Sequence, residues 1–288
     1  MSQFQQNLRI AGYNIRLSSD REIMLEEGYV PFVTNDHPIT DLTIHCIAGL
    51  PAVTGAERLK PVFEAENEQQ KFYSIFQHAE GYIFLLYNQQ THSEIQQVGY
   101  LNQALTEWKL FYEGGDANPF PLKYPMGPIL LHYLTLNHDA VMMHASCAYD
   151  GETSRMFTGF SGVGKSTMSQ LWANAGNRII NDDRLIIRKE RWGYSVHNTP
   201  MYYSDIPKSA PLGGIFLIRH SPENILKRVD GAMAVSRVMA FSIQNNYDPD
   251  VIAKRLAFFS ELCTSVPVYD MGFVPDATAV HHILTHEA

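Results

Sequence analysis

Residues 156–169 read MFTGFSGVGKSTMS, and this stretch decides the fold expected for the second half of the chain. Within it, Gly159 to Ser166 fits the pattern G-x-x-x-x-G-K-[ST]. An apolar run precedes the pattern and an amphipathic run follows it, which predicts a strand, a tight loop and a helix. Glycines let successive backbone N–H groups turn inward around one anion. The stretch therefore predicts a loop that binds the phosphates of a nucleoside triphosphate.

The residue types of the loop each have a chemical reason. Lys165 supplies a positive charge to the β- and γ-phosphates, and Ser166 offers a hydroxyl to Mg²⁺. The helix that begins near Lys165 adds the partial positive charge of its N-terminus. The expected cofactors are ATP and Mg²⁺, with the choice between ATP and GTP left open. The nucleotide-binding residues expected from the loop are Gly159, Ser161, Gly162, Val163, Gly164, Lys165, Ser166 and Thr167.

Two aspartates, Asp182 and Asp183, follow the apolar run that comes after the predicted helix. An acidic residue at a strand end beside a phosphate loop can hold Mg²⁺, or can orient and deprotonate a hydroxyl group. Adjacent strand residues point to opposite faces, so one aspartate could serve the site while the other orders the loop. The alternative is a polar turn between two strands. His144 ends an earlier apolar run, where by itself a histidine is more often structural.

Three segments in this order resemble the catalytic domain of HPr kinase/phosphorylase: HAS at 144–146, FTGFSGVGKST at 157–167 and NRIINDD at 177–183. HNTP at 197–200, APLGGIFLIR at 210–219 and VPVYDMGFVPDATAV at 266–280 look like the broader group of HPr-kinase-related proteins. The resemblance covers residues 139–286. It implies an α/β (α+β) fold, with a P-loop on a mixed sheet of the type shared by HPr kinase and phosphoenolpyruvate carboxykinase.

The resemblance also implies an activity, an ATP-dependent kinase that transfers the γ-phosphoryl group to a hydroxyl. The implied catalytic residues are Asp182, Asp183, His144 and Lys165, with Ser166 and Asp183 at the metal. Asp182 is favoured as the base, Asp183 lies near the metal, and His144 tunes their ionisation. The sequence lacks the Glu-x-Arg-Gly signature of true HPr kinases. The acceptor is therefore left as a protein Ser/Thr or a small molecule.

Two other functions fit the same motifs. The chain could be a nucleotide-binding regulatory or scaffold module with little turnover, or a simple NTPase. The kinase hypothesis requires Asp182, Asp183 and His144 to converge within reach of the γ-phosphate position, whereas a binding module does not.

Residues 1–120 predict a smaller β-rich N-terminal domain of unknown role, followed by a P-loop kinase-like domain over 121–288. Alternating apolar and polar residues predict strands at 8–19 and 41–50, and Glu80-Gly81 predicts the turn of a hairpin. GGDANPFPLKYP at 114–125 carries two glycines and three prolines, which is typical of a boundary.

Helices are expected in four further segments besides the one that follows the phosphate loop. The residues 125–138 carry an early proline, and Asp230 and Asp248 stand at N-cap positions of the segments 230–243 and 248–264. The residues 276–286 are the fourth segment. Gly176 suits the position that ends the helix after the phosphate loop.

Composition limits the partners. The formal net charge is −8 and the pI about 5.8, so nucleic acid is not an expected partner. No apolar run is long enough to predict a membrane span. The three cysteines show no CxxC or zinc spacing, which indicates reduced thiols and a cytoplasmic protein. Because HPr kinases are hexamers, the resemblance implies a homo-oligomer.

Overall fold

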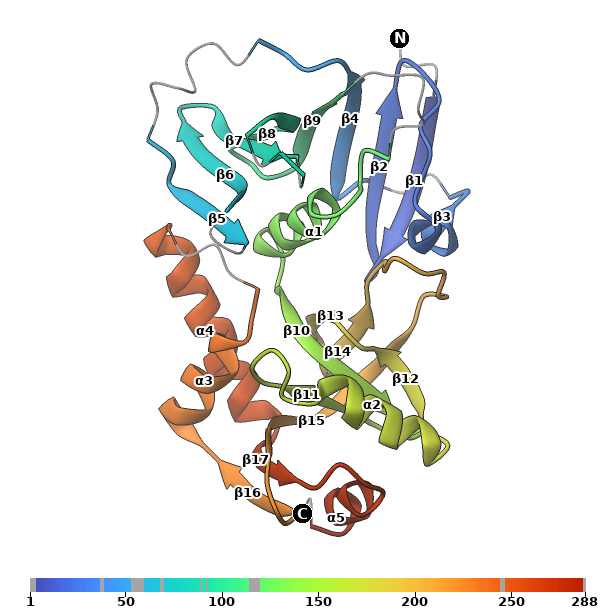
Figure 1. Cartoon of the computed structure of the whole chain (residues 1–288), viewed down its shortest axis with the longest axis vertical. Coiled ribbons are helices and arrows are strands. Elements are labelled where there is room, and N and C mark those ends of the chain that lie inside the picture. Colours follow the sequence, from blue (N-terminus) through green and yellow to red (C-terminus); the bar gives the residue numbers. More distant parts are fainter. Residues whose placement is uncertain are drawn as a thin grey trace. The chain divides into compact units, whose positions relative to one another are not determined.

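The computed structural model describes residues 4–36, 39–52, 60–67, 70–88, 90–91, 93–113, 120–243 and 247–286. The chain divides into two compact units, each with its own sheet (Figure 1). The first unit comprises Met1–Asn137 and Pro200–Ile206, and the second comprises His138–Thr199 and Pro207–Ala288. The first unit takes in the helix α1 (Met126–Leu136), which follows the domain boundary predicted near residue 120. Residues 114–119 of that boundary segment lie outside the described residues.

The first unit is built on a nine-stranded sheet in the order β3-β1-β2-β4-β9-β8-β7-β6-β5, counted over its described residues. The pairs β2–β4 and β4–β9 are parallel, and the other neighbours are antiparallel. Its strands are β1 (Phe4–Ile10), β2 (Tyr13–Ser19), β3 (Val33–Thr34), β4 (Leu42–Ala48), β5 (Phe63–Asn67), β6 (Gln70–His78), β7 (Gly81–Tyr87), β8 (Ile95–Asn102) and β9 (Glu107–Tyr112).

The hairpin predicted at Glu80-Gly81 is confirmed as the β6–β7 connection, in which His78 pairs with Gly81. Gly81 has φ +140°, and a Cβ there would lie 2.0 Å from the carbonyl oxygen of Leu101. Only glycine fits both the conformation and the space.

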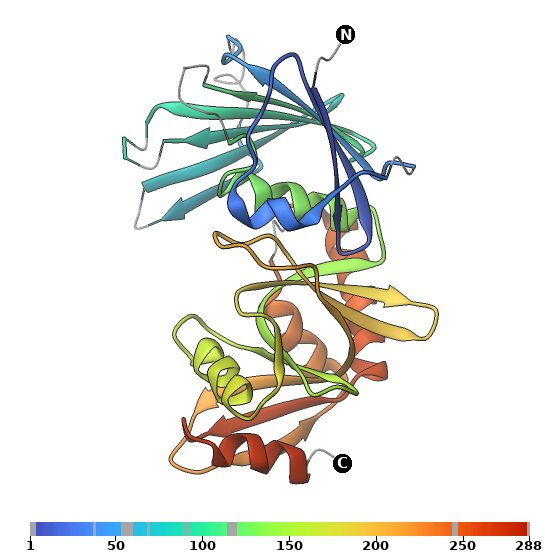
Figure 2. The same cartoon turned by 90° about the vertical axis from the view of Figure 1, so that its right-hand side faces the viewer.

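One core of the first unit lies on the face of the sheet under α1 and the 3₁₀ helix η1 (Glu27–Phe32) (Figure 2), and a second buried cluster, which includes Leu85 and Val98, lies on the opposite face. The Phe84 ring contacts the Trp108 ring at 4.7 Å and the Tyr133 ring of α1 at 5.0 Å, between centroids. All three rings are buried, because alternate strand residues face the helices.

The second unit has a mixed sheet, which confirms the expected mixed α/β architecture. Its order is β11-β10-β13-β14-β15-β17-β16, with β12 beside β10 and a further pairing of β11 with β15. The pairs β11–β15 and β15–β17 are parallel. The strands are β10 (Ala140–Tyr149), β11 (Ser154–Thr158), β12 (Arg178–Asn181), β13 (Arg184–Glu190), β14 (Gly193–Asn198), β15 (Ser209–His220), β16 (Ile225–Val229) and β17 (Val268–Phe273).

Helices cover both faces of the β11–β15–β17 part of this sheet. Phe157 and Phe216 belong to a cluster with α2 (Lys165–Asn174) and α5 (Thr278–His286). Ile215 and Leu217 belong to the other cluster, with α3 (Gly231–Ala240) and α4 (Pro249–Ser265). Alternate residues of β15 thus serve opposite faces, so the strand reads as a continuous apolar run.

The helix ends differ in detail from the prediction. Asp248 caps α4 as expected, because its carboxylate accepts from the backbone N–H of Asp250 at 2.9 Å. Asp230 stands at the N-cap position of α3, but its carboxylate accepts from Arg228 at 2.9 Å rather than from the helix. The helix predicted over 230–243 ends at Ala240.

Candidate active site

The predicted loop joins β11 to α2 at the carboxyl end of β11. Gly162 and Gly164 have φ values of +75° and +100°, in the left-handed region that glycine tolerates best. A Cβ at Gly164 would also lie 2.7 Å from the Phe273 ring of β17. The glycine spacing of the motif is therefore a requirement of backbone conformation and of packing.

Lys165 begins α2 and turns its side chain back over the loop. The Nζ atom donates to the carbonyl oxygens of Gly159 and Phe160 at 3.2 and 3.1 Å. The buried Ser146 hydroxyl of β10 donates to the Lys165 carbonyl oxygen at 3.1 Å. Burial lowers the pKa of the Lys165 ammonium, while Asp183 and Asp182 act in the opposite sense. The lysine charge is thus held inside the loop and faces both carboxylates.

Asp182 contacts α2. Its carboxylate accepts from the Ser169 hydroxyl at 3.1 Å, and the Ser166 hydroxyl lies near enough to lower its pKa. Burial raises the pKa of Asp182, and these two hydroxyl groups oppose that shift. A carboxylate and the first-turn hydroxyl of the phosphate loop therefore lie together.

Asp183 faces β10 instead. One carboxylate oxygen lies 3.4 Å from Nε2 of His144, and the other lies 2.8 Å from a guanidinium nitrogen of Arg184. Burial lowers the pKa of His144, Lys165 lowers it further, and Asp183 raises it. Neutral imidazole is therefore favoured beside Asp183 near neutral pH.

The turn that carries the aspartates is fixed from both sides. The Asn181 amide donates to the carbonyl oxygens of Arg184 and Thr199 at 2.7 and 3.4 Å. The Thr199 hydroxyl donates to the same Arg184 carbonyl at 3.0 Å. Thr199, in the segment HNTP at 197–200, thus helps to hold the aspartate turn in place.

The structure brings the predicted catalytic residues near one another: His144 lies 3.4 Å from Asp183, and the charge of Lys165 acts on His144 and on Asp182. The side chains of Ser161, Ser166 and Thr167 are exposed along the loop and the first turn of α2, and Val163 and Gly164 are half-buried. Gly159 is buried beside the carbonyl oxygen of Ile218 at the end of β15.

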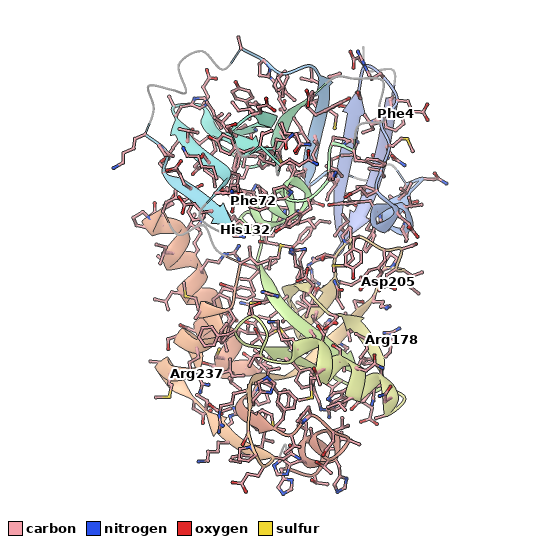
Figure 3. All side chains as sticks on the ribbon, viewed as in Figure 1. Phe4, Phe72, His132, Arg178, Asp205 and Arg237 are labelled. Atoms are coloured by element: carbon pink, nitrogen blue, oxygen red, sulfur yellow. The ribbon has the colours of Figure 1, made fainter. Side chains whose placement is uncertain are left out.

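Sequence reasoning missed several residues of this region. Ser169 could have been found, because it follows Ser166 by three positions and shares its helix face. Asp270 of β17 could not, since its partners Arg219 and Arg237 come from β15 and α3, at 3.1 and 2.7 Å; Figure 3 labels Arg237. The Lys208 ammonium donates to the carbonyl oxygen of Ile179 at 3.0 Å.

No protein-family model and no curated protein match the chain. Among solved structures, the Hpr(Ser) kinase/phosphatase from Coxiella burnetii matches with 11% sequence identity and a TM-score of 0.30. The match covers 51% of this chain and 99% of that one. At this identity and TM-score the structural resemblance is distant. Among the described residues, no helix is both long and apolar enough to cross a membrane.

Proposed function

We propose that the chain is a Mg²⁺·ATP-dependent kinase of the HPr-kinase-related type, which transfers the γ-phosphoryl group to a hydroxyl of a protein Ser/Thr or a small molecule. One observation carries this proposal. A lysine inside a phosphate loop, a hydroxyl, two carboxylates and a histidine meet at one place, although they come from β10, the loop, α2 and the turn after β12.

The residues fit a nucleotide and its metal. The Lys165 ammonium donates to two loop carbonyl oxygens, at 3.1 and 3.2 Å, and phosphate oxygens are stronger acceptors for a cation. The Ser166 hydroxyl and the Asp182 carboxylate are oxygen ligands of the kind that Mg²⁺ prefers. When bound, Mg²⁺·ATP supplies the phosphoryl group and neutralises its charge.

The contacts of the two aspartates support a different catalytic role for each. Asp182 lies with Ser166 and would hold the metal, whereas Asp183 lies with His144 and would accept the hydrogen bond of the attacking hydroxyl. This division exchanges the roles favoured from the sequence, and it is part of the proposal.

The second carboxylate favours a kinase over a binding module. Nucleotide binding alone needs the loop, Lys165 and one metal ligand. A further carboxylate paired with a histidine beside that lysine is the arrangement that orients a nucleophile. The sequence resemblance to HPr-kinase-related proteins points the same way.

The test is transfer of labelled phosphate from γ-labelled ATP with Mg²⁺, using a cell extract as the source of acceptors. We expect the wild type to label an acceptor, Lys165→Ala to lose both nucleotide binding and labelling, and Asp183→Asn to keep binding but lose about 10²–10⁴-fold in transfer rate. Lys189→Ala is the matched control, because Lys189 pairs with Glu261 on the surface at 2.6 Å.

Two outcomes would contradict the kinase. If ATP binds through Lys165 but no acceptor is labelled and no phosphate is released, the chain is a binding module. If phosphate is released to water at the same rate with and without extract, it is an NTPase.

A further inference from the structure

A serine, a histidine and a glutamate form a chain of contacts on the sheet of the first unit, apart from the candidate active site. The Ser18 hydroxyl of β2 lies 2.7 Å from Nδ1 of His45 on β4. Nε2 of the same imidazole lies 3.4 Å from a carboxylate oxygen of Glu107 on β9. The strands β2, β4 and β9 are consecutive in the sheet (Figure 1). Strand pairing therefore brings the three side chains together, with the imidazole in the middle.

The register places these side chains on the face of the sheet opposite α1. Ser18 pairs with His45 across β2 and β4, and Glu107 pairs with Thr43, two residues before His45. Trp108, which follows Glu107, packs on a ring of α1, and alternate strand residues face opposite sides. The side chains of His45 and Glu107 are 42% and 46% exposed, so the imidazole and its carboxylate are open to water.

The order of the contacts decides where the protons lie. A carboxylate only accepts hydrogen bonds, so Glu107 favours the imidazole tautomer that carries its hydrogen on Nε2. Nδ1 of His45 is then an acceptor, and the Ser18 hydroxyl donates to it. A histidine that is oriented by a carboxylate and accepts from a hydroxyl is arranged as the general base of a nucleophile.

The second unit holds the same three residue types in a different order. There the Ser195 hydroxyl lies between His197 and Glu190, and it donates to the carboxylate at 3.0 Å. His197 is therefore the donor to that hydroxyl, and its imidazole is not placed to take the hydroxyl proton. The comparison shows that the position of the imidazole in the chain, rather than the presence of the three residue types, gives Ser18 its base.

Arg16 adds a positive charge on the same face. It precedes Ser18 by two positions, which in a strand places the two residues about 6.6 Å apart on one side of the sheet. Its Nε atom is buried and has no hydrogen-bond partner among the described residues. When a hydroxyl attacks a carbonyl group, negative charge develops on the carbonyl oxygen, and a guanidinium beside the nucleophile stabilises it.

We propose that Ser18 is the nucleophile of an esterase site and that His45 is its general base. Glu107 positions the imidazole, and Arg16 stabilises the oxyanion. The site lies wholly in the first unit and does not depend on the proposed kinase function. Ser18 is only 8% exposed, so the substrate class is an unhindered carboxylic ester with a short acyl group.

The reaction has two steps. In the first, Ser18 Oγ forms a bond to the acyl carbon and its proton moves to Nδ1 of His45. The bond between the acyl carbon and the alcohol oxygen then breaks, and the leaving alkoxide takes this proton. In the second, water attacks the acyl carbon and gives a proton to His45, which passes it to Ser18 Oγ as the carboxylic acid leaves.

The test uses p-nitrophenyl acetate and the full chain, without ATP. We expect a burst of nitrophenolate and an acetyl group on the peptide that contains Ser18, detected by mass spectrometry after an acid quench. Ser18→Ala should lose both, and His45→Gln, at a half-exposed position, should slow acylation by about 10²–10⁴-fold. Ser195→Ala is the matched control and should keep the wild-type burst and the acetyl group.

Glu107→Gln and Arg16→Gln should each lower the maximal rate of acylation, and Glu107→Gln should not change the ester concentration at half-maximal rate. Unchanged urea midpoints show that these variants are folded. The absence of a burst in the wild type overturns the inference, and so does acetylation that maps to a lysine or tyrosine or a burst that His45→Gln leaves intact. Transfer of labelled phosphate is a separate assay, so failure of the esterase and failure of the kinase are distinguished.

Discussion

At the scale of single residues, Asp182 and Asp183 show how neighbours acquire different chemistry. The strand β12 ends at Asn181, and the turn sends one carboxylate to α2 and the other to β10. Asp182 therefore meets hydroxyl groups and Asp183 meets an imidazole and a guanidinium. The pair was visible in the sequence, but its division was not, because Ser169 lies 13 residues from Asp182 in the chain and His144 lies further still from Asp183.

This division predicts that substitution of Asp182 and substitution of Asp183 impair different steps, metal binding and phosphoryl transfer. Asp182→Asn removes the carboxylate that would hold the metal, so the Mg²⁺ concentration for half-maximal activity should rise, by about tenfold or more. Asp183→Asn should leave that concentration unchanged and lower kcat. Initial rates over a Mg²⁺ titration at saturating ATP measure both. If Asp183→Asn shifts the Mg²⁺ requirement and Asp182→Asn does not, the roles are the reverse, as the sequence favoured.

At the scale of elements, the sequence predicted the strands, helices and turns that depend on residues close together in the chain. The strand–loop–helix unit around Lys165, the β6–β7 hairpin and the α4 cap are confirmed, since each depends on residues close in sequence. The edge strand β16 and the helix η1 were not predicted. β16 pairs only with β17 among the described residues, and its exposed Lys227 and Arg228 hide the apolar alternation.

The phosphate loop predicts a contrast between two glycines. Gly162→Ala meets nothing within 4 Å and should cost only the strain of its φ of +75°, on the order of 1 kcal/mol. Gly164→Ala adds a contact of 2.7 Å with the buried Phe273 ring to a φ of +100°. It should lower the urea midpoint further and weaken ATP binding by more than Gly162→Ala. Equal losses in the two variants would show that packing on β17 is unimportant.

The hairpin β13–β14 predicts a pH-dependent stability. His197 Nε2 lies 2.8 Å from the Ser195 hydroxyl, which donates to Glu190 at 3.0 Å, so the imidazole nitrogen acts as the donor. Burial lowers the pKa of His197 to about 4, and Arg188 adds to this shift. The unfolded chain binds a proton near pH 6.5 and the folded chain only near pH 4. Stability is therefore complete above pH 6.5 and falls between pH 6.5 and 4.

His197→Gln should remove this dependence, which is on the order of 2–3 kcal/mol over that interval. Urea unfolding at pH 7, 5.5 and 4.5 measures it. His281→Gln, an exposed position on α5, is the control and should keep the wild-type slope. An unchanged slope in His197→Gln would mean that other groups cause the acid sensitivity.

At the scale of the whole molecule, the sequence carries no local pattern for how distant strands pair within each unit. The parallel pairs β2–β4 and β4–β9 join strands that no local pattern connects. The segment Pro200–Ile206 belongs to the first unit, although the chain on both sides of it belongs to the second. A Cβ on Gly28 of η1 would lie 1.6 Å from the carbonyl oxygen of Met201, so this attachment depends on a glycine far away in sequence.

Separate sheets and cores predict that nucleotide stabilises one unit alone. The chain carries a buried thiol, Cys46, in the first unit and two, Cys147 and Cys263, in the second. Burial raises their pKa to about 12, 12 and 11, so alkylation at pH 8 requires local opening. With Mg²⁺·ATP at about 100 times its Kd, the second unit gains about 2.7 kcal/mol.

Alkylation of Cys147 and Cys263 by iodoacetamide should then slow by up to about 100-fold, while Cys46 reacts at its original rate. Peptide mass spectrometry of timed samples follows each thiol separately. Lys165→Ala should abolish the protection of both, which ties the effect to the phosphate loop rather than to ATP in solution. Parallel slowing of Cys46 would instead show that the two units open together as one cooperative structure, so that the first unit senses nucleotide bound to the second.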